Sequence, residues 1–196
     1  MKKLACYLMA LAIAQFSQAQ GSDAGRIFKK FKVDVSLGYA APQSSSAGSS
    51  FSGGALFAIE PKYSVIDPLT IGLRIEVAAI VHEYNNNNSN NSNQSNGKAN
   101  ISYLFTGDYY FSNKNFRPFL GAGAGIFVIA NVDSTNYNSN TNSIPTTSQF
   151  GFMVRGGFEA GHLRLGIEYN FVGNSASYLG VKVGVCIGGG RKKKPT

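Results

Sequence analysis

The sequence predicts an all-β fold, an eight-stranded antiparallel up-and-down transmembrane β-barrel. Three observations support this prediction: apolar and polar residues alternate over eight segments, short and long connections alternate along the chain, and the N-terminus has the pattern of an export signal. Alternation alone also fits a soluble β-protein, because it shows only that each strand has one apolar and one polar face. The other two observations favour an apolar face that meets lipid.

The N-terminal segment predicts export from the cytoplasm. Two lysines precede an apolar run over residues 4–16, and small residues follow it up to Ala19. This pattern is typical of a secretory signal peptide over residues 1–19, which is removed after Ala19. The run is shorter than the ~20 residues that a membrane-spanning helix requires. Cys186 is then the only remaining cysteine, so we expect no intramolecular disulfide.

Strand-like alternation recurs between residues 31 and 188, which we interpret as the barrel. Residues 20–30 then form a periplasmic lead, and residues 189–196 a glycine-rich basic periplasmic tail. The predicted strands are Phe31–Ala41, Gly53–Val65, Leu69–Val81, Ala99–Phe111, Pro118–Ala130, Gln149–Ala160, Leu163–Val172 and Tyr178–Gly188.

Charged residues share one register within these strands, opposite an almost entirely apolar register. In Leu69–Val81, odd positions are aliphatic whereas Arg74 and Glu76 occupy even ones. The fifth strand has no such contrast, since both of its registers are apolar or glycine, and its lipid-facing side is not predicted. We expect these charged residues to form an ion-pair network in the lumen with a structural role. Its members are Glu60, Lys62, Arg74, Glu76, Asp108, Arg155, Glu159, Arg164, Glu168 and Lys182.

Charge balance within the strands favours an enclosed polar face. Lys32 and Asp34 belong to the same register, and with them six acidic residues match six basic ones. Ions that are withdrawn from water must be paired, because an unpaired buried ion carries a large desolvation cost. The chain as a whole carries a net charge of +8. We expect the basic surplus, including Arg117, at the turns and termini.

The connections predict which end of the barrel faces outward. Residues 66–68, 112–117 and 161–162 form short turns, whereas residues 42–52, 82–98, 131–148 and 173–177 form looser connections rich in Asn, Ser, Thr and Gly. Membrane barrels have short periplasmic turns and longer external loops. An even number of strands places both termini on the turn side.

Aromatic residues near the strand ends predict girdles at the level of the lipid headgroups. The alternative is ordinary packing inside a β-core. The residues concerned are Tyr63, Tyr84, Tyr103, Tyr109, Phe111, Tyr169, Phe171 and Tyr178.

Three segments carry a resemblance to a known family. They are the Arg-Pro-Phe-Leu-Gly-Ala-Gly-Ala-Gly stretch from Arg117, the Leu-Gly-Ile-Glu-Tyr pattern from Leu165, and Tyr-Leu-Gly-Val-Lys-Val-Gly from Tyr178. With them the mature chain resembles small bacterial outer-membrane β-barrel proteins of the OmpA/OmpX type, the outer-membrane β-barrel domain or porin family. Many members end on an aromatic residue that the assembly machinery recognises, whereas glycines and a basic tail follow the last strand here.

The resemblance implies location in the outer membrane of a Gram-negative type of cell, with outer-membrane lipid and the barrel-assembly machinery as partners. An eight-stranded barrel is just wide enough to be filled by side chains. We therefore expect a non-enzymatic protein with a charge-plugged lumen and Asn/Ser-rich external loops, which bind an unknown external ligand. Envelope structure, adhesion or surface shielding are its expected roles.

Several alternatives stay open. A narrow pore or small-solute channel is the main one, a lipid-modifying enzyme with His82 beside Ser89 or Ser102 is another, and a soluble secreted barrel that binds an apolar ligand is a third. We expect no cofactor and no metal site, because two histidines and one cysteine far apart lack ligand spacing. No nucleic-acid partner is expected. The alternate glycines from Gly121 continue into a strand, whereas a phosphate-binding loop precedes a helix.

Overall fold

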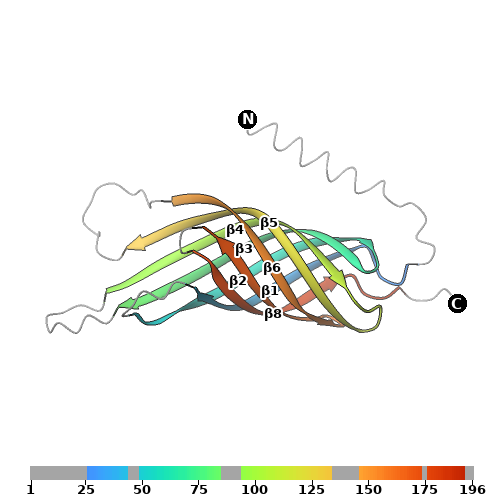
Figure 1. Ribbon diagram of the computed structural model, residues 1–196. Coiled ribbons are helices and arrows are strands. Elements are labelled where there is room, and N and C mark those ends of the chain that lie inside the picture. Colours follow the sequence, from blue (N-terminus) through green and yellow to red (C-terminus); the bar gives the residue numbers. More distant parts are fainter. Residues whose placement is uncertain (1–25, 44–48, 85–93, 134–145, 174–175, 193–196) are drawn as a thin grey trace, which may run out of the picture.

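Eight antiparallel strands form a single closed barrel in the computed structural model (Figure 1). The structure describes residues 26–43, 49–84, 94–133, 146–173 and 176–192. The strands follow one another around the barrel in chain order: β1 (Phe31–Pro42), β2 (Ser49–Ile66), β3 (Leu69–Tyr84), β4 (Gln94–Tyr110), β5 (Phe116–Asp133), β6 (Thr146–Ala160), β7 (Leu163–Val172) and β8 (Tyr178–Gly188).

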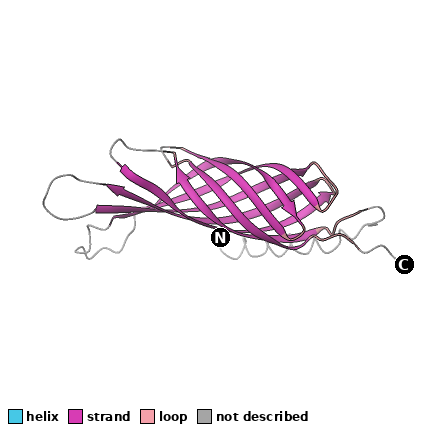
Figure 2. Cartoon of the chain, turned by 90° about the horizontal axis from the view of Figure 1, so that it is seen from below, coloured by secondary structure: helices cyan, strands magenta, loops and turns pink. Residues whose placement is uncertain are grey.

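The first strand closes the barrel by pairing on both edges. Asp34 lies opposite Glu60 of β2 and opposite Cys186 of β8, and every neighbouring pair of strands is antiparallel. Figure 2 shows the strands tilted steeply across the long axis, as closure of a sheet requires. The predicted eight-stranded up-and-down barrel is thus confirmed. Among the described residues, no helix is long and apolar enough to cross a membrane.

Tight connections lie at one end of the barrel, which we call the turn end. Asp67 and Pro68 join β2 to β3, and Gly161 and His162 join β6 to β7. Gly161 has a φ of 62°, a left-handed conformation that glycine adopts without steric cost. These turns are as short as the sequence predicts.

Five strands, β2 to β6, are longer by three residues or more at the opposite end, the loop end, than the sequence predicts. β3 continues to Tyr84 and β4 begins at Gln94, so the ladder includes much of the predicted connection 82–98. β2, β5 and β6 also extend into predicted connections, to Ser49, Asp133 and Thr146. The prediction failed here because backbone groups pair irrespective of the polar side chains that mark a loop.

The loop-end parts of β2 to β5 form what we call the projecting sheet, made of residues 49–53, 82–84, 94–98 and 131–133. At 18 residues, β2 and β5 far exceed the ~9–11 residues that a tilted strand needs to cross the hydrocarbon. β7 and β8 have only 10 and 11 residues. Because the turn end is level, the surplus length projects at the loop end (Figure 1).

Both described chain ends lie at the turn end and contact each other. Phe28 forms a β-bridge with Arg191, and Lys29 N–H donates to the carbonyl of Gly190 over 3.1 Å. The described part of the predicted lead and tail is therefore attached to the barrel. The predicted signal peptide, residues 1–19, lies outside the described residues, as does the rest of the lead.

Candidate functional site: the charged lumen

Side chains alternate between a charged interior and an apolar exterior. On β3, Leu73 and Ile75 are 60% and 52% exposed, whereas Arg74 and Glu76 are each 1% exposed. A water-soluble barrel would have the opposite arrangement. Charge inside and aliphatic or aromatic residues outside are the distribution of a barrel that faces hydrocarbon.

The orientation of β5 becomes clear in the structure. Its odd-numbered residues face inward: Arg117, Phe119 and Phe127 are buried, while Leu120 and Ile126 are exposed on the outside. Sequence patterning could not decide this, because the middle of the inward face consists of glycine. Gly121 makes room for Asp108 and Arg155, which are charged side chains from the two neighbouring strands.

Ionic groups near the turn end form one network, the turn-end cluster, built from Lys32, Asp34, Glu60, Lys62, Asp108, Tyr110, Arg117, Arg155, Glu159 and Arg164. Asp108 is its centre: Lys62 Nζ and Arg155 Nε lie 2.7 Å from its two oxygens, and Arg164 Nη2 lies 2.8 Å from Oδ2. Lys62 also contacts Asp34 over 2.6 Å. One carboxylate thus joins cations from three strands.

Glu60 and Arg155 form a fork within this cluster. Arg155 donates from Nη1 to Oε2 over 2.7 Å and from Nη2 to Oε1 over 2.6 Å, and Thr106 adds a hydroxyl donor to Oε1. Bidentate pairs of this kind are strong and directional. The fork joins β2 to β6 across the lumen.

Tyr110 connects the remaining members of the cluster. Its hydroxyl donates to Glu159 over 2.9 Å and accepts from Lys32 and Arg164, each over 2.7 Å. Lys32 also contacts Glu159 directly over 2.5 Å. A phenol serves here because it is both a donor and an acceptor.

The mid-lumen cluster lies farther from the turns and comprises Arg74, Glu76, Asn170, Tyr178, Glu168 and Lys182. Arg74 donates to Glu168 through two hydrogen bonds and also pairs with Glu76. Lys182 pairs with Glu168 and lies 3.6 Å from Glu76. Tyr178 O–H donates to Glu76 over 2.6 Å.

Two inward glycines explain how ionic groups reach across intervening strands. Gly121 pairs with both Asp108 and Arg155, and an added Cβ would lie 2.1 Å from Asp108 Oδ1. Gly72 lies between Lys62 and Thr106, and its Cβ would lie 2.9 Å from Lys62 Cγ. Neither position has room for a side chain.

An apolar cluster fills the lumen on the loop side of the charges. Leu56, Leu104, Phe127 and Met153 are all at most 2% exposed and pack together. The other members are Ala40, Ala78, Ile80, Ile129, Val172 and Tyr178. Sequence analysis predicts only ionic filling, whereas the lumen also contains this hydrophobic layer.

All ten residues of the expected lumen network point into the barrel, and each has at least one ion-pair partner there. Six of them are in the turn-end cluster: Glu60, Lys62, Asp108, Arg155, Glu159 and Arg164. The other four, Arg74, Glu76, Glu168 and Lys182, are in the mid-lumen cluster. Lys32 and Asp34 belong to the turn-end cluster as well.

Two residues lie elsewhere than the sequence predicts. Arg117 is not a surface charge of a turn: it is 4% exposed, lies on β5 and stacks between the rings of Phe28 and Tyr110. Tyr178 is not part of an outer girdle, since it is fully buried in the lumen. The position of Arg117 follows from the register of β5, which the sequence left ambiguous. Tyr178 shares the inward register of β8 with Lys182, so the expected lumen position of Lys182 already implied it.

Other predicted girdle residues do face outward. Tyr103, Tyr109, Phe111 and Phe171 are each about half exposed on the outer wall. The rings of Tyr109 and Phe111 meet edge to face, with centroids 5.3 Å apart. Tyr84 lies outside the described side chains.

No group of three or more His, Cys, Asp or Glu residues that could hold a metal ion occurs in the part of the chain that the structure describes. The alternative enzymatic site at His82 and Ser89 lies outside the described side chains. Ser102, the other serine considered, is buried in the lumen. His162 is in the β6–β7 turn, where its Nδ1 lies 2.8 Å from the carbonyl of Cys186.

Comparison with known proteins supports the fold. No protein-family model matches the chain, and no curated protein matches it significantly. Neisserial surface protein A is 17% identical and matches with a TM-score of 0.55 over 82% of this chain and 98% of that one. The chain has the fold of the small eight-stranded outer-membrane β-barrels.

Two further solved structures from Pseudomonas aeruginosa match with TM-scores below 0.5. The outer-membrane protein OprG is 12% identical, with a TM-score of 0.46 over 87% of this chain and 99% of that one. The N-terminal β-barrel domain of OprF is 12% identical, with a TM-score of 0.42 over 82% and 99%. The fold comparison therefore rests on Neisserial surface protein A, and membrane insertion rests on the apolar exterior.

Proposed function

We propose that this protein is a non-enzymatic integral outer-membrane protein with a sealed lumen, and that it acts at the outer surface in adhesion, shielding or envelope integrity. The observation that carries the proposal is the filling of the lumen at three successive levels. Each level is closed by side chains that contact one another directly.

The first level is the turn-end mouth. Phe28 is 6% exposed and lies over the guanidinium of Arg117, whose Cζ is 3.9 Å from the ring centroid. Arg117 in turn lies 4.0 Å from the ring of Tyr110 and donates to the carbonyl of Asp67 over 2.9 Å. Asp67 accepts from the backbone N–H groups of Ile27 and Phe28, which holds this segment in the mouth.

The second level is the pair of ionic clusters, and the third is the apolar cluster around Phe127. Between the two ionic clusters remains a cavity of about 20 Å³, lined by Asp34, Glu60, Arg155 and Lys182 among others. That volume holds about one water molecule.

The projecting sheet supports a role at the outer surface. Its strands extend beyond the membrane-crossing length, and Ala130 is the last residue of β5 with a described partner on β6. β5 then continues to Asp133, and this last part of the strand pairs with β4. A strand ladder that extends beyond the membrane gives a partner at the outer surface a sheet on which it can bind.

Single-channel recording tests the sealed lumen against the alternative of a narrow pore. In planar bilayers the wild-type barrel should give no steady conductance steps. Arg155→Ala combined with Phe28→Ala and Phe127→Ala removes one filling side chain at each of the three levels, and this variant should give steps. Steady steps from the wild-type protein would establish the pore instead.

The surface role is tested by shortening one external connection. Tyr84 and Gln94 are cross-strand partners, so an Asn-Gly turn can replace residues 85–93 without disturbing the ladder. Cells that carry this variant should lose surface adhesion or shielding, while the purified barrel keeps its different gel mobilities before and after boiling. The equivalent replacement in the β5–β6 connection joins the cross-strand partners Ala130 and Thr146. Unchanged surface behaviour after both replacements contradicts the proposed role.

A further inference from the structure

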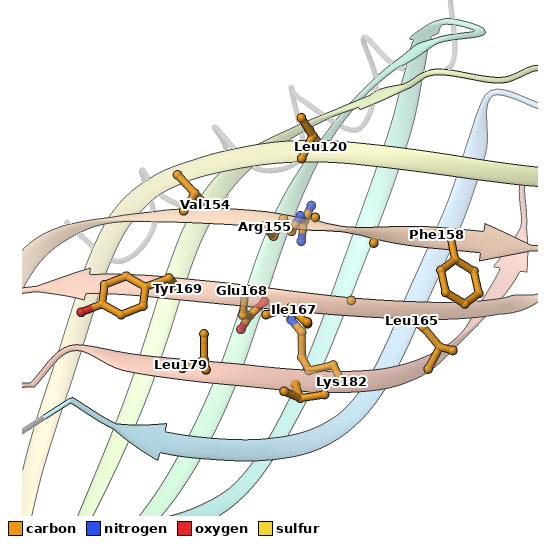
Figure 3. A pocket seen from close by; sticks show the side chains of 14 residues that line it. Leu120, Val154, Arg155, Phe158, Leu165, Ile167, Glu168, Tyr169, Leu179 and Lys182 are labelled. Carbon is orange, nitrogen blue, oxygen red and sulfur yellow. Dashed lines mark ion pairs between the residues drawn. The ribbon is translucent and has the colours of Figure 1, made fainter.

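The outer wall of β5 to β8 contains an apolar groove with a volume of about 730 Å³ (Figure 3). It is centred on Gly156, an outward position without a side chain on β6. Leu120, Ile167 and Val181, each at least half exposed, stand around it as walls. Its size is within the range of small-molecule binding sites.

Two further glycines contribute to the floor of the groove. Gly157 and Gly166 are cross-strand partners on the inward register, and the ring of Phe119 lies behind them, 3.6 Å from where a Cβ of Gly166 would be. Arg155, Glu168 and Lys182, whose side chains point into the lumen, also line the floor. All these residues are paired in the β-ladder, so the backbone N–H and C=O groups of the floor already have hydrogen-bond partners. The floor is therefore suited to an apolar ligand.

We propose that this groove binds one acyl chain of a glycerophospholipid from the turn-side leaflet. The inference rests on the proposed function, since the groove is continuous with the wall that faces hydrocarbon. It extends from Phe158 to Val154 on β6 and from Leu165 to Tyr169 on β7. At ~3.3 Å per residue these stretches are roughly 13 Å long, which fits within one half of a hydrocarbon core of ~30 Å.

Charge near the turns favours a phospholipid as the source of the chain. The backbone N–H of Gly161 donates to the carbonyl of Asn115 over 3.2 Å, which brings the β4–β5 connection beside the β6–β7 turn below the groove. Lys114 in that connection is exposed. A lysine at the headgroup level attracts an anionic phosphate.

A matched pair of variants tests the site. Gly156→Leu fills the groove, and its Cβ meets only the flexible end of Leu120, 3.1 Å away, and a carbonyl 3.8 Å away. Gly107→Leu adds the same side chain on β4, where a Cβ meets nothing closer than 3.9 Å. Both variants should fold, so that they differ in the groove alone.

The measurement is native mass spectrometry of barrels folded into palmitoyl-oleoyl phosphatidylglycerol vesicles and extracted in mild detergent. Wild type and Gly107→Leu should each retain one phospholipid, and Gly156→Leu should show about tenfold lower occupancy. A second arm adds an equimolar amount of lipopolysaccharide, which should not displace the phospholipid.

Three results overturn the inference: equal retention by wild type and Gly156→Leu, preferential retention of lipopolysaccharide, or a wild-type dimer that Gly156→Leu dissociates. The gel mobility of unboiled protein separates this inference from the proposed function. Barrels that fold in vesicles but retain no lipid contradict the groove site alone, whereas failure to fold in vesicles contradicts the membrane barrel itself.

Discussion

Arg74 and Glu168 face each other across the barrel through two hydrogen bonds, of 2.6 Å from Nη1 to Oε2 and 2.5 Å from Nη2 to Oε1. Both side chains are at most 1% exposed. The pair joins β3 to β7, strands that are not neighbours in the sheet. Removing one partner of such a buried pair leaves an unpaired ion in the lumen, which is strongly destabilising.

Loss of Glu168 should therefore destabilise the barrel. Glu168→Ala leaves Arg74 and Lys182 without their main partner and should lower the free energy of unfolding by about 3–5 kcal/mol. Urea unfolding of barrels in lipid vesicles measures the change. The double variant Arg74→Leu and Glu168→Leu retains the Lys182–Glu76 contact and should cost less than Glu168→Ala. A double variant that costs more would show that shape, and not charge pairing, dominates.

The lipid-facing register can be tested on neighbouring residues of β3. Ile75 faces outward, so Ile75→Arg should lower stability by about 2–4 kcal/mol if it lies near the bilayer midplane. Ile75→Leu serves as the control and should change little. The yield of heat-modifiable barrel in vesicles provides the measurement. Normal insertion of Ile75→Arg, together with poor insertion of Glu76→Leu, would reverse the assignment of faces.

Gly121 and Gly107 provide a matched comparison of an inward and an outward glycine. Gly121→Ala places a methyl group 2.1 Å from Asp108 Oδ1, so the central carboxylate has to move away from Arg155. Overpacking of this kind costs about 1–3 kcal/mol. Gly107→Ala meets nothing closer than 3.9 Å and should be close to neutral. Equal urea midpoints for the two variants would rule out the tight inward packing.

Cys186 reports on closure of the turn-end mouth. Its side chain is buried on the inward face of β8, near the turn end. Phe28→Ala opens the mouth and should increase the rate at which a maleimide reacts with this thiol. Phe31→Ala removes a ring that is 59% exposed on the outer wall and should leave the rate unchanged. Mass spectrometry of the labelled protein follows the reaction, and equal rates in both variants would mean that Phe28 does not close the mouth.

The sequence by itself determined the barrel. The strict alternation of apolar and polar residues identified the two faces of β3. The short turns and the even number of strands placed both termini at the turn end. Both properties can be read from the local order of residues. Residues such as Asp108 and Glu159 could be assigned to the lumen from their register alone. The loop-end extent of β2 to β6 could not be predicted, since polar strand residues outside a membrane have the composition of loops.

Only the tertiary structure decided which charges meet. Arg74 and Glu168 are 94 residues apart, and any inward acid could have been the partner of this arginine until barrel closure set the stagger of the strands. The inward face of β5 was hidden for a related reason: Gly121 has no side chain to reveal a register, and its function is to leave space for Asp108 and Arg155. Arg117 lies in the lumen because it shares this inward face with Gly121, since alternate residues of one strand lie on the same side.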